Sequence, residues 1–274
     1  IEKKMAILIA GEMGSGKTSL ANALCGLIPP SYRIGTAEDI PEFRIPHRNV
    51  LRCLTRDAFT IEGTGKIELF DLVKHLLRMN VDYIIVNEIR GEESKVWMQA
   101  ISTGHGGITT IHAAGPEVAL DRLADLGVTI SRLKALYAIV HIQPYYKRVN
   151  GELTKKIRRI RELVDVDIKR KGDYDLTRVF KYDLKNDTYI MAPLDVVLNT
   201  RTVKTIMSLN NWSQSNFIKD FNHRVKFLKW LREQCEDNPS LAEPENLIQI
   251  FEKYYDNKHF FEESIVEENA KGIK

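Results

Sequence analysis

The sequence is poor in cysteine, lacks long apolar runs and carries little net charge. Its three cysteines, Cys25, Cys53 and Cys235, are widely separated without zinc-ligand spacing, so we expect free thiols in a reducing compartment. No apolar run approaches the roughly 18 residues that a membrane span needs. The N-terminal segment also lacks the apolar region of a signal peptide. The net charge of +3 is too small to indicate a nucleic-acid-binding protein by itself.

The length and composition are those of a folded protein. With 274 residues, 43% of them hydrophobic, the chain fits one large α/β domain or one domain with a small appendage. It begins without methionine and only a few residues before its first predicted strand. We therefore expect that an upstream portion of the protein precedes this sequence.

A glycine loop near the N-terminus is the strongest motif. An apolar run at residues 5–10 leads into Gly-x-x-x-x-Gly-Lys-Thr at residues 11–18, and a helix-forming segment follows. This order of strand, loop and helix is the context of a phosphate-binding P-loop. The glycines let successive N–H groups point into one concavity, at the positive end of the helix dipole. The residues expected to contact a nucleotide are Gly11, Met13, Gly14, Ser15, Gly16, Lys17, Thr18 and Ser19. Lys17 would reach the β- and γ-phosphates, and the Thr18 hydroxyl would hold Mg²⁺.

An acidic segment, Glu38-Asp39-Ile40-Pro41-Glu42, follows a short predicted strand at residues 33–37. Ligands of open α/β sheets bind beyond the carboxyl ends of the strands, so carboxylates there could order Mg²⁺ or activate water. The alternative is an acidic turn in which an Asp caps a helix. Residues 45–56 are expected to form an arginine-rich loop, which either clamps phosphate, serves a neighbouring subunit, or carries solvated surface charge.

Two later segments add polar side chains at predicted strand ends. Residues 82–88 form an apolar run that ends on Glu88, the pattern of a buried parallel strand with a Walker B acid, although Glu88 could instead cap the next helix. Residues 103–113 contain a glycine-rich turn and a strand that ends on His112, which could sense the γ-phosphate. Isolated histidines are more often structural, and the absence of cysteines or carboxylates at ligand spacing excludes a metal site in this segment.

The rest of the sequence predicts secondary structure but few functional residues. We expect helices at residues 67–78, 116–126 and 133–138, a strand at 138–143 and a hairpin at 175–190. Residues 155–168 suggest antiparallel strands with one solvent-exposed face. Their basic cluster could contact lipid headgroups or nucleic acid, but a solvated strand face is favoured. From about residue 200 the chain is predicted helical, with Ser215 capping one helix and Pro244 starting another.

In combination, these motifs resemble those of the secretion ATPase superfamily, which powers type II and type IV secretion, type IV pili and the archaeal flagellum. The stretches that carry the resemblance are residues 38–47 with 54–56, residues 69–72 with 82–93, and residues 103–113. The acidic run with its Pro46-His47 pair is most similar to the archaeal branch. The resemblance implies an α/β, RecA-like P-loop NTPase with a mostly parallel twisted sheet and a few antiparallel strands. It also implies a motor domain at residues 1–200, a small helical subdomain at residues 201–274, and an N-terminal domain that is absent from this sequence.

The family's site residues map by motif. Glu38 matches the acid that positions the attacking water, and Glu88 matches the Walker B acid. By this resemblance Thr18, Glu38 and Glu88 would hold Mg²⁺, directly or through water. The histidine box corresponds to His105, at the nucleotide, and His112, which would read the γ-phosphate. The arginines of the matching neighbourhood are Arg44, Arg48 and Arg56, acting either in their own subunit or across a subunit boundary. Asn87 departs from the pattern, because the family usually has Gly before the Walker B Glu.

The resemblance further implies an ATPase that uses ATP and Mg²⁺, works as a homo-hexamer and pushes a membrane platform protein of a pilus, archaellum or secretion system. Such a protein is cytoplasmic, at the inner face of the cell membrane, and no direct nucleic-acid contact is expected. Without the family's N-terminal domain, this chain should bind ATP less tightly than the longer protein. Three alternatives stay open: a nucleic-acid-translocating hexameric motor, a small-molecule P-loop kinase, and a degenerate nucleotide-binding assembly subunit.

Overall fold

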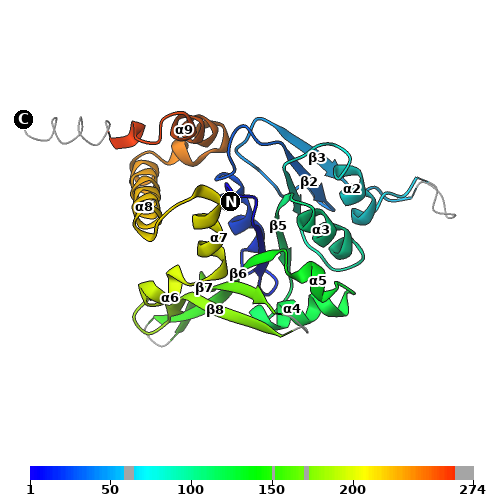
Figure 1. The fold of residues 1–274 in the computed structure, drawn as a ribbon, viewed down its shortest axis with the longest axis horizontal. Coiled ribbons are helices and arrows are strands. Elements are labelled where there is room, and N and C mark those ends of the chain that lie inside the picture. Colours follow the sequence, from blue (N-terminus) through cyan, green and yellow to red (C-terminus); the bar gives the residue numbers. More distant parts are fainter. Residues whose placement is uncertain (59–64, 150–151, 170–172, 263–274) are drawn as a thin grey trace, which may run out of the picture.

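In the computed structural model, a single mixed sheet runs through the chain (Figure 1). The structure describes residues 1–58, 65–149, 152–169 and 173–262, and in these ranges the strand order is β3-β2-β4-β5-β1-β6-β7-β8-β9. The pairs from β3 to β6 are parallel and those from β6 to β9 are antiparallel. The predicted α/β class, with a mostly parallel sheet and a few antiparallel strands, is therefore confirmed.

The parallel strands are β1 (Ala6–Ala10), β2 (Ile34–Glu38), β3 (Val50–Leu54), β4 (Tyr83–Val86), β5 (Gly106–Ile111) and β6 (Leu136–Val149). β5 lies between β1, which leads into the glycine loop, and β4, which precedes Glu88. Since parallel strands end at the same edge, the segments that follow β1, β2, β4 and β5 meet there, where ligands of such sheets bind.

Helices cover both faces of the parallel strands, which explains why β1 and β4 are continuously apolar. On one face, Ile9 and Ile85 pack with Ala21 of α1 (Lys17–Cys25). On the other, Leu8 and Ile84 pack with the remaining helices of the parallel half. These helices are α2 (Leu69–Leu76), α3 (Glu93–Ser102), α4 (Pro116–Asp125) and α5 (Ile130–Leu133). The alternation along each strand therefore divides the core into two layers.

Helix α2 shows how the sequence pattern produces this packing. Leu69, Leu72, Val73 and Leu76 recur at helical spacing and are all buried against the sheet. Burial of each such side chain contributes about 1.5–3 kcal/mol. A capping box between Glu68 and Asp71 satisfies N–H groups at the helix start.

Two predicted segments are wrong. β3 occupies part of the predicted arginine-rich loop, because it pairs in register with β2 from Ile34↔Val50 to Glu38↔Leu54 and forms the sheet edge. The helix predicted at residues 133–138 does not form. The observed helix α5 ends at Leu133, and β6 begins at Leu136 and pairs with β1. In both cases long-range strand pairing overrides local propensity.

The antiparallel part contains β7 (Glu152–Ile168), β8 (Tyr174–Asp183) and β9 (Thr188–Met191). The predicted hairpin is confirmed, with Asp187 at positive φ in its turn. Residues 155–168 form one strand, and the face predicted to be solvent-exposed is partly covered. Asp165 is buried there and accepts hydrogen bonds from the backbone N–H groups of Arg201 and Thr202 at the start of α7.

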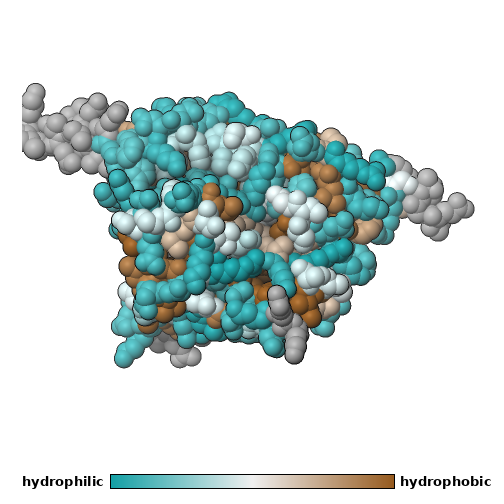
Figure 2. Space-filling view, viewed as in Figure 1, coloured by the Kyte–Doolittle hydropathy of each residue, from teal (hydrophilic) through white to brown (hydrophobic). Residues whose placement is uncertain are grey.

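The last helices are α6 (Leu194–Leu198), α7 (Arg201–Asn210), α8 (Gln214–Asp237), the 3₁₀ helix η2 (Pro239–Ala242) and α9 (Pro244–Asp256). Ser213, not the predicted Ser215, caps α8, whereas α9 starts at Pro244 as expected. An aromatic cluster, including Phe227 and Phe251, joins α8 to α9. In Figure 2 hydrophobic side chains gather over α6 and the lower part of α8. Within the described ranges, none of the helices combines the length and apolar character of a membrane crossing.

Candidate active site

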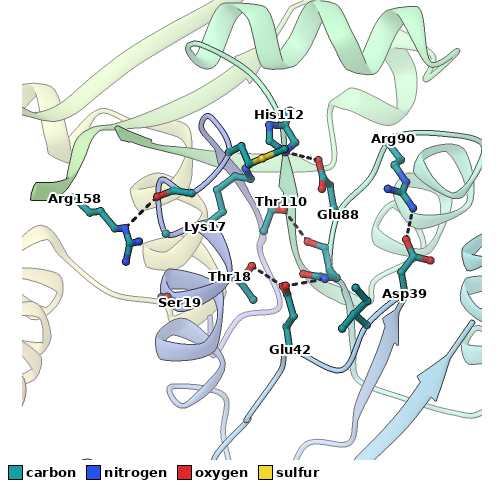
Figure 3. A pocket seen from close by; sticks show the side chains of 15 residues that line it. Lys17, Thr18, Ser19, Asp39, Glu42, Glu88, Arg90, Thr110, His112 and Arg158 are labelled. Atoms are coloured by element: carbon teal, nitrogen blue, oxygen red, sulfur yellow. Dashed lines mark hydrogen bonds and ion pairs between the residues drawn. The ribbon is translucent and has the colours of Figure 1, made fainter. Parts of the chain in front are cut away.

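A cavity of about 390 Å³ lies at the carboxyl edge of the parallel strands (Figure 3). The glycine loop and the start of α1 form one side of it, and the segments after β2, β4 and β5 form the other. Most of the polar side chains that the sequence singled out at strand ends are brought together here. The lining residues are Met13, Gly14, Gly16, Lys17, Thr18, Ser19, Asp39, Ile40, Glu42, Asn87, Glu88, Arg90, Thr110, His112 and Arg158.

The glycine loop has the backbone of an anion cradle. Gly14 and Gly16 adopt φ values of 68° and 101°, which disfavour residues with a Cβ atom. At Gly11, a Cβ would lie 2.4 Å from the carbonyl oxygen of Ile142. No side chain of the described residues caps the N-terminus of α1, so its first N–H groups can serve an anion. The Ser15 hydroxyl is buried in the loop without a hydrogen-bond partner among the described residues.

Lys17 is buried at the base of this cradle. Its Nζ donates hydrogen bonds to the carbonyl oxygens of Gly11, at 3.0 Å, and Glu12, at 3.1 Å. Desolvation lowers the pKa of Lys17, and the negative charges of Glu88 and Glu42 oppose that shift. The ammonium group therefore gains from any further negative charge, and phosphate oxygens are better partners for it than the two loop carbonyls.

Opposite the loop, Glu42 is the acid of the segment after β2 that reaches the cradle. Its Oε2 accepts hydrogen bonds from the Thr18 hydroxyl, at 3.0 Å, and from the Asn87 side-chain amide, at 3.1 Å (Figure 3). Sequence reasoning assigned Glu42 to the acidic segment but gave it no role. Its position four residues beyond the end of β2 was the available signal, because a residue there is free of the sheet and can face the cavity.

Glu38, which was expected to position water and help to hold Mg²⁺, is not among the residues that line this cavity. It is the last residue of β2 and is 1% exposed. Its carboxylate accepts hydrogen bonds from the Thr36 hydroxyl at 2.9 Å and from the backbone N–H groups of Glu42, at 2.8 Å, and Phe43, at 2.9 Å. These hydrogen bonds of Glu38 thus hold in place the loop that carries Glu42 into the cavity lining.

Glu88 and His112 come from adjacent strand ends and face each other across the cavity. Oε1 of Glu88 and Nε2 of His112 are 3.2 Å apart, and both side chains are about one-third exposed. Next to them, the Thr110 hydroxyl donates a 2.7 Å hydrogen bond to the carbonyl oxygen of Asn87, which fixes β5 against the segment after β4. The predicted Walker B acid and the second histidine of the histidine box are therefore neighbours.

Two arginines that sequence reasoning did not assign to the site lie at its rim. Arg158 of β7 donates from Nε to the carbonyl oxygen of Gly14 at 3.1 Å, so it lies over the glycine loop. Arg90 forms an ion pair with Asp39. Arg158 belongs to the basic cluster that was interpreted as a solvated strand face. β6 lies beside β1, the strand that leads into the glycine loop, and β7 pairs antiparallel with β6. Only this pairing brings Arg158 to the loop.

Besides Glu38 and the loop residues Gly11 and Ser15, four further residues of the predicted site do not line the cavity within the described part of the chain. Arg48 pairs with Glu252 of α9, and Arg56 donates from Nε to the carbonyl oxygen of Gly65. Arg44 is exposed, and its backbone N–H donates a hydrogen bond to Oδ1 of Asn22. His105 precedes β5 while His112 follows it, so His105 lies at the opposite edge of the sheet. There its ring bonds to the carbonyl oxygen of Ala100 at the end of α3.

Comparison with known proteins gives this arrangement a context. The family model described as type II/IV secretion system protein matches residues 1–208. The uncharacterized protein MJ1287 of Methanocaldococcus jannaschii is 35% identical over 93% of this chain and 91% of its own length. The type IV secretion system protein PtlH of Bordetella pertussis is 44% identical over 45% of this chain, and the match spans only 37% of PtlH.

Parts of this chain are also similar to solved structures. The VirB11 ATPase of the Brucella suis type IV secretion system, in complex with sulphate, superposes with a TM-score of 0.48 at 30% identity. That match covers 58% of this chain and 49% of the other. The pilus retraction motor PilT with bound ADP superposes with a TM-score of 0.44 at 21% identity, over 74% of this chain and 53% of the other.

Proposed function

This chain belongs to the type II/IV secretion system protein family, and we propose that it is the motor ATPase that drives assembly of a pilus or archaellum, or secretion of a substrate, in such a system. It binds a nucleotide and is an ATPase, in keeping with its family. The single observation that carries the proposal is the cavity in which the glycine loop, Glu42, and the Glu88–His112 pair face one another.

The nucleotide's phosphates would lie on the glycine loop. The free N–H groups at the start of α1 and the Lys17 ammonium supply positive charge there. The oxygen donors of Thr18, Glu42 and Glu88 are ligands of the type that Mg²⁺ accepts, directly or through water. When bound, Mg²⁺ supplies positive charge against the β- and γ-phosphates.

We assign the water-positioning role to Glu42 instead of Glu38. Water attacks the γ-phosphorus, the bond from that phosphorus to the β–γ bridging oxygen breaks, and a proton of the water passes to the Glu42 carboxylate. ADP and inorganic phosphate leave, and the proton is released to solvent. The geometry behind this assignment is that Glu42 already contacts Thr18, whereas the oxygens of Glu38 are occupied by the loop.

His112 and the arginines would link the phosphates to movement. His112, paired with Glu88, is placed to respond when the γ-phosphate is lost, and Arg158 adds positive charge beside the loop. Arg44, Arg48 and Arg56 lie outside the cavity of their own chain, so we propose that one or more of them approaches the nucleotide of a neighbouring subunit in a homo-hexamer. His105 has no such role in this scheme.

The wider setting is also proposed from the family. The motor would be cytoplasmic, at the inner face of the cell membrane, and would push a membrane platform protein. Residues 1–200 would form the motor domain and residues 201–274 a helical subdomain.

The test is Mg²⁺-dependent ATP hydrolysis across a range of protein concentrations, with Lys17→Ala as the blank. Specific activity that rises with concentration is expected, because the site would be completed between subunits. Activity that is present but independent of concentration would contradict the ring motor and favour a self-sufficient P-loop kinase. Stimulation by single-stranded DNA would favour a nucleic-acid motor instead. Activity no higher than the blank would overturn the proposal.

A further inference from the structure

Three side chains that can bind metal converge at the helical end of the molecule. His223 lies on α8, and His259 and Glu262 follow α9. One ligand atom from each residue can be chosen so that all three lie within 4.8 Å of one another. α8 and α9 lie together at one end of the view in Figure 1, and none of the three residues lines the nucleotide cavity. The cluster therefore needs an explanation separate from the ATPase site.

His223 is the least satisfied member of this cluster. Its side chain is 15% exposed, and its Nε2 is buried without a hydrogen-bond partner among the described residues. The ring stacks against Tyr254, with 6.2 Å between centroids, and lies 4.7 Å from the ring of His259. An imidazole nitrogen that is buried without a hydrogen-bond partner is available to a metal ion.

The distances suit ligands of one ion better than a network of hydrogen bonds. Nε2 of His223 and Oε1 of Glu262 are 3.9 Å apart, which is too long for a hydrogen bond, while Nδ1 of His259 and Oε2 of Glu262 are 2.8 Å apart. Two donors about 2.1 Å from a tetrahedral zinc ion are about 3.4 Å from each other. The observed separations bracket that value, so small side-chain rotations would bring all three donors to one ion.

We propose that His223, His259 and Glu262 form a binding site for a transition-metal ion, best matched by Zn²⁺ with a water molecule as fourth ligand. Two imidazoles and one carboxylate are a donor set that zinc accepts in tetrahedral geometry. Ca²⁺ and Mg²⁺ do not fit, because they require several oxygen ligands. The positive charges of Lys226 and Lys258 act on this cluster, so imidazole coordination, not simple charge attraction, must hold the ion.

Such an ion would join two segments of the aromatic cluster. His223 precedes the buried Phe227 by one helical turn, and Phe261, which is fully buried, lies between His259 and Glu262 in sequence. The rings of Phe227 and Phe261 are 5.5 Å apart. Metal binding would therefore fasten the segment after α9 onto α8. An entry path exists, because the side chains of His259 and Glu262 are 68% and 42% exposed.

The experiment is a calorimetric titration of the whole chain with ZnCl₂ after treatment with a chelator. His259→Ala and Glu262→Gln are the test variants, since both side chains are exposed enough to be changed without loss of the fold, which circular dichroism would verify. His75→Ala, at an exposed histidine of α2, is the matched control. His112→Ala removes the other pair that could hold zinc, Glu88–His112, from the nucleotide cavity.

We expect the wild type, His75→Ala and His112→Ala to share one zinc site. In His259→Ala and Glu262→Gln that site should weaken by at least about 100-fold, beyond the loss that an outer-shell partner causes. Zinc should also raise the melting temperature of the wild type but not of these two variants. Unchanged affinity in both variants would overturn the proposal, as would loss of the site in His112→Ala alone. These readouts do not depend on ATP hydrolysis.

Discussion

The hydroxyl of Thr18 donates a hydrogen bond of 3.0 Å to Glu42, a residue 24 positions later in the sequence. This contact joins the start of α1 to the loop after β2, so the residue expected at Mg²⁺ and the acid proposed to act on water meet across the cavity. The side-chain amide of Asn87 donates to the same carboxylate oxygen from the end of β4. Three separate segments thus meet on one carboxylate.

If Glu42 takes the proton from water, Glu42→Gln should preserve the fold and ATP binding but not turnover. The amide can still accept the hydrogen bond from Thr18, but it cannot accept a proton. We expect kcat to fall by about 100- to 10,000-fold, the range for loss of a general base. Steady-state hydrolysis and an ATP-binding titration would measure the two effects, with Glu92→Gln, an exposed acid of the segment before α3, as control. Near-normal kcat in Glu42→Gln would contradict the assignment.

Glu38→Gln should instead act on stability. The buried Glu38 carboxylate accepts hydrogen bonds from two backbone N–H groups and a hydroxyl, and an amide nitrogen cannot accept any of them. We expect the free energy of unfolding to fall by about 1–3 kcal/mol, the usual cost of leaving a buried donor unpaired. Urea denaturation would measure it. Glu42→Gln, at an exposed side chain, should stay within about 0.5 kcal/mol of the wild type. The opposite ranking of the two variants would show that Glu38 is not a structural acid.

The two glutamates illustrate how far the sequence can predict this site. The segments that become β1, β4 and β5 can be recognised as strands, and each is followed directly by a polar motif. The sequence therefore predicts which segments meet at one edge of the sheet. The sequence does not say where β2 ends to within a residue. Because Glu38 is still paired within β2 whereas Glu42 lies four residues beyond it, the end of the strand decides which of the two is free to face the cavity. The sequence therefore identifies the segment, and the exact end of β2 distinguishes its two glutamates.

Other parts of the structure depend on contacts between distant residues. Arg158 reaches the carbonyl oxygen of Gly14 across 144 positions, through the pairing of β7 with β6. Nothing near Arg158 in the sequence distinguishes it from Arg159, which pairs with Asp187 on the hairpin. β3 was missed for a similar reason, because its residues form a strand by pairing with β2 at the sheet edge.

Asn87 departs from the family pattern, and the contribution of its hydrogen bond to Glu42 can be tested by substitution. Asn87→Gly restores the residue that the family usually has, but it removes the 3.1 Å hydrogen bond to Glu42. Loss of one such bond corresponds to about 0.5–1.5 kcal/mol, so we expect kcat to fall by about 2- to 10-fold with little change in KM. Asn87→Ser, which retains a shorter donor, should lie between the two. A kcat equal to or above that of the wild type in Asn87→Gly would show that Asn87 does not position Glu42.

Arg158 can be tested against its neighbour on the same strand. Arg158→Ala should lower ATP affinity by about 10- to 100-fold, the effect of losing a charged hydrogen bond of about 1.5–3 kcal/mol. Arg159→Ala removes an equal charge from β7 but away from the cavity, so ATP affinity should change little. Titration with a fluorescent ATP analogue would measure both. If the two variants lose affinity equally, Arg158 contributes only general charge.

Acid sensitivity of the fold should depend in part on Glu162 of β7, whose side chain is 10% exposed. A hydrogen bond with His141 and the charge of Arg178 hold the pKa of Glu162 below its usual value of about 4.5, against the opposing effect of burial. A carboxyl whose pKa is lowered in the folded state binds its proton more readily in the unfolded state. Its stabilising contribution is therefore complete above about pH 4.5 and is lost as the pH falls through the lower pKa of the folded protein.

Urea denaturation at pH 7 and at several values below pH 5 would measure this contribution. Glu162→Gln should be less stable than the wild type at pH 7, and the difference should shrink as the solution is acidified, because the amide that replaces the carboxyl does not titrate. Glu236→Gln changes an exposed acid of α8 that pairs with Arg232 on the surface, where such pairs contribute little. It should follow the wild type at every pH. If the difference in free energy of unfolding between wild type and Glu162→Gln stays constant from pH 7 to pH 3, the substitution acts through packing and not through charge.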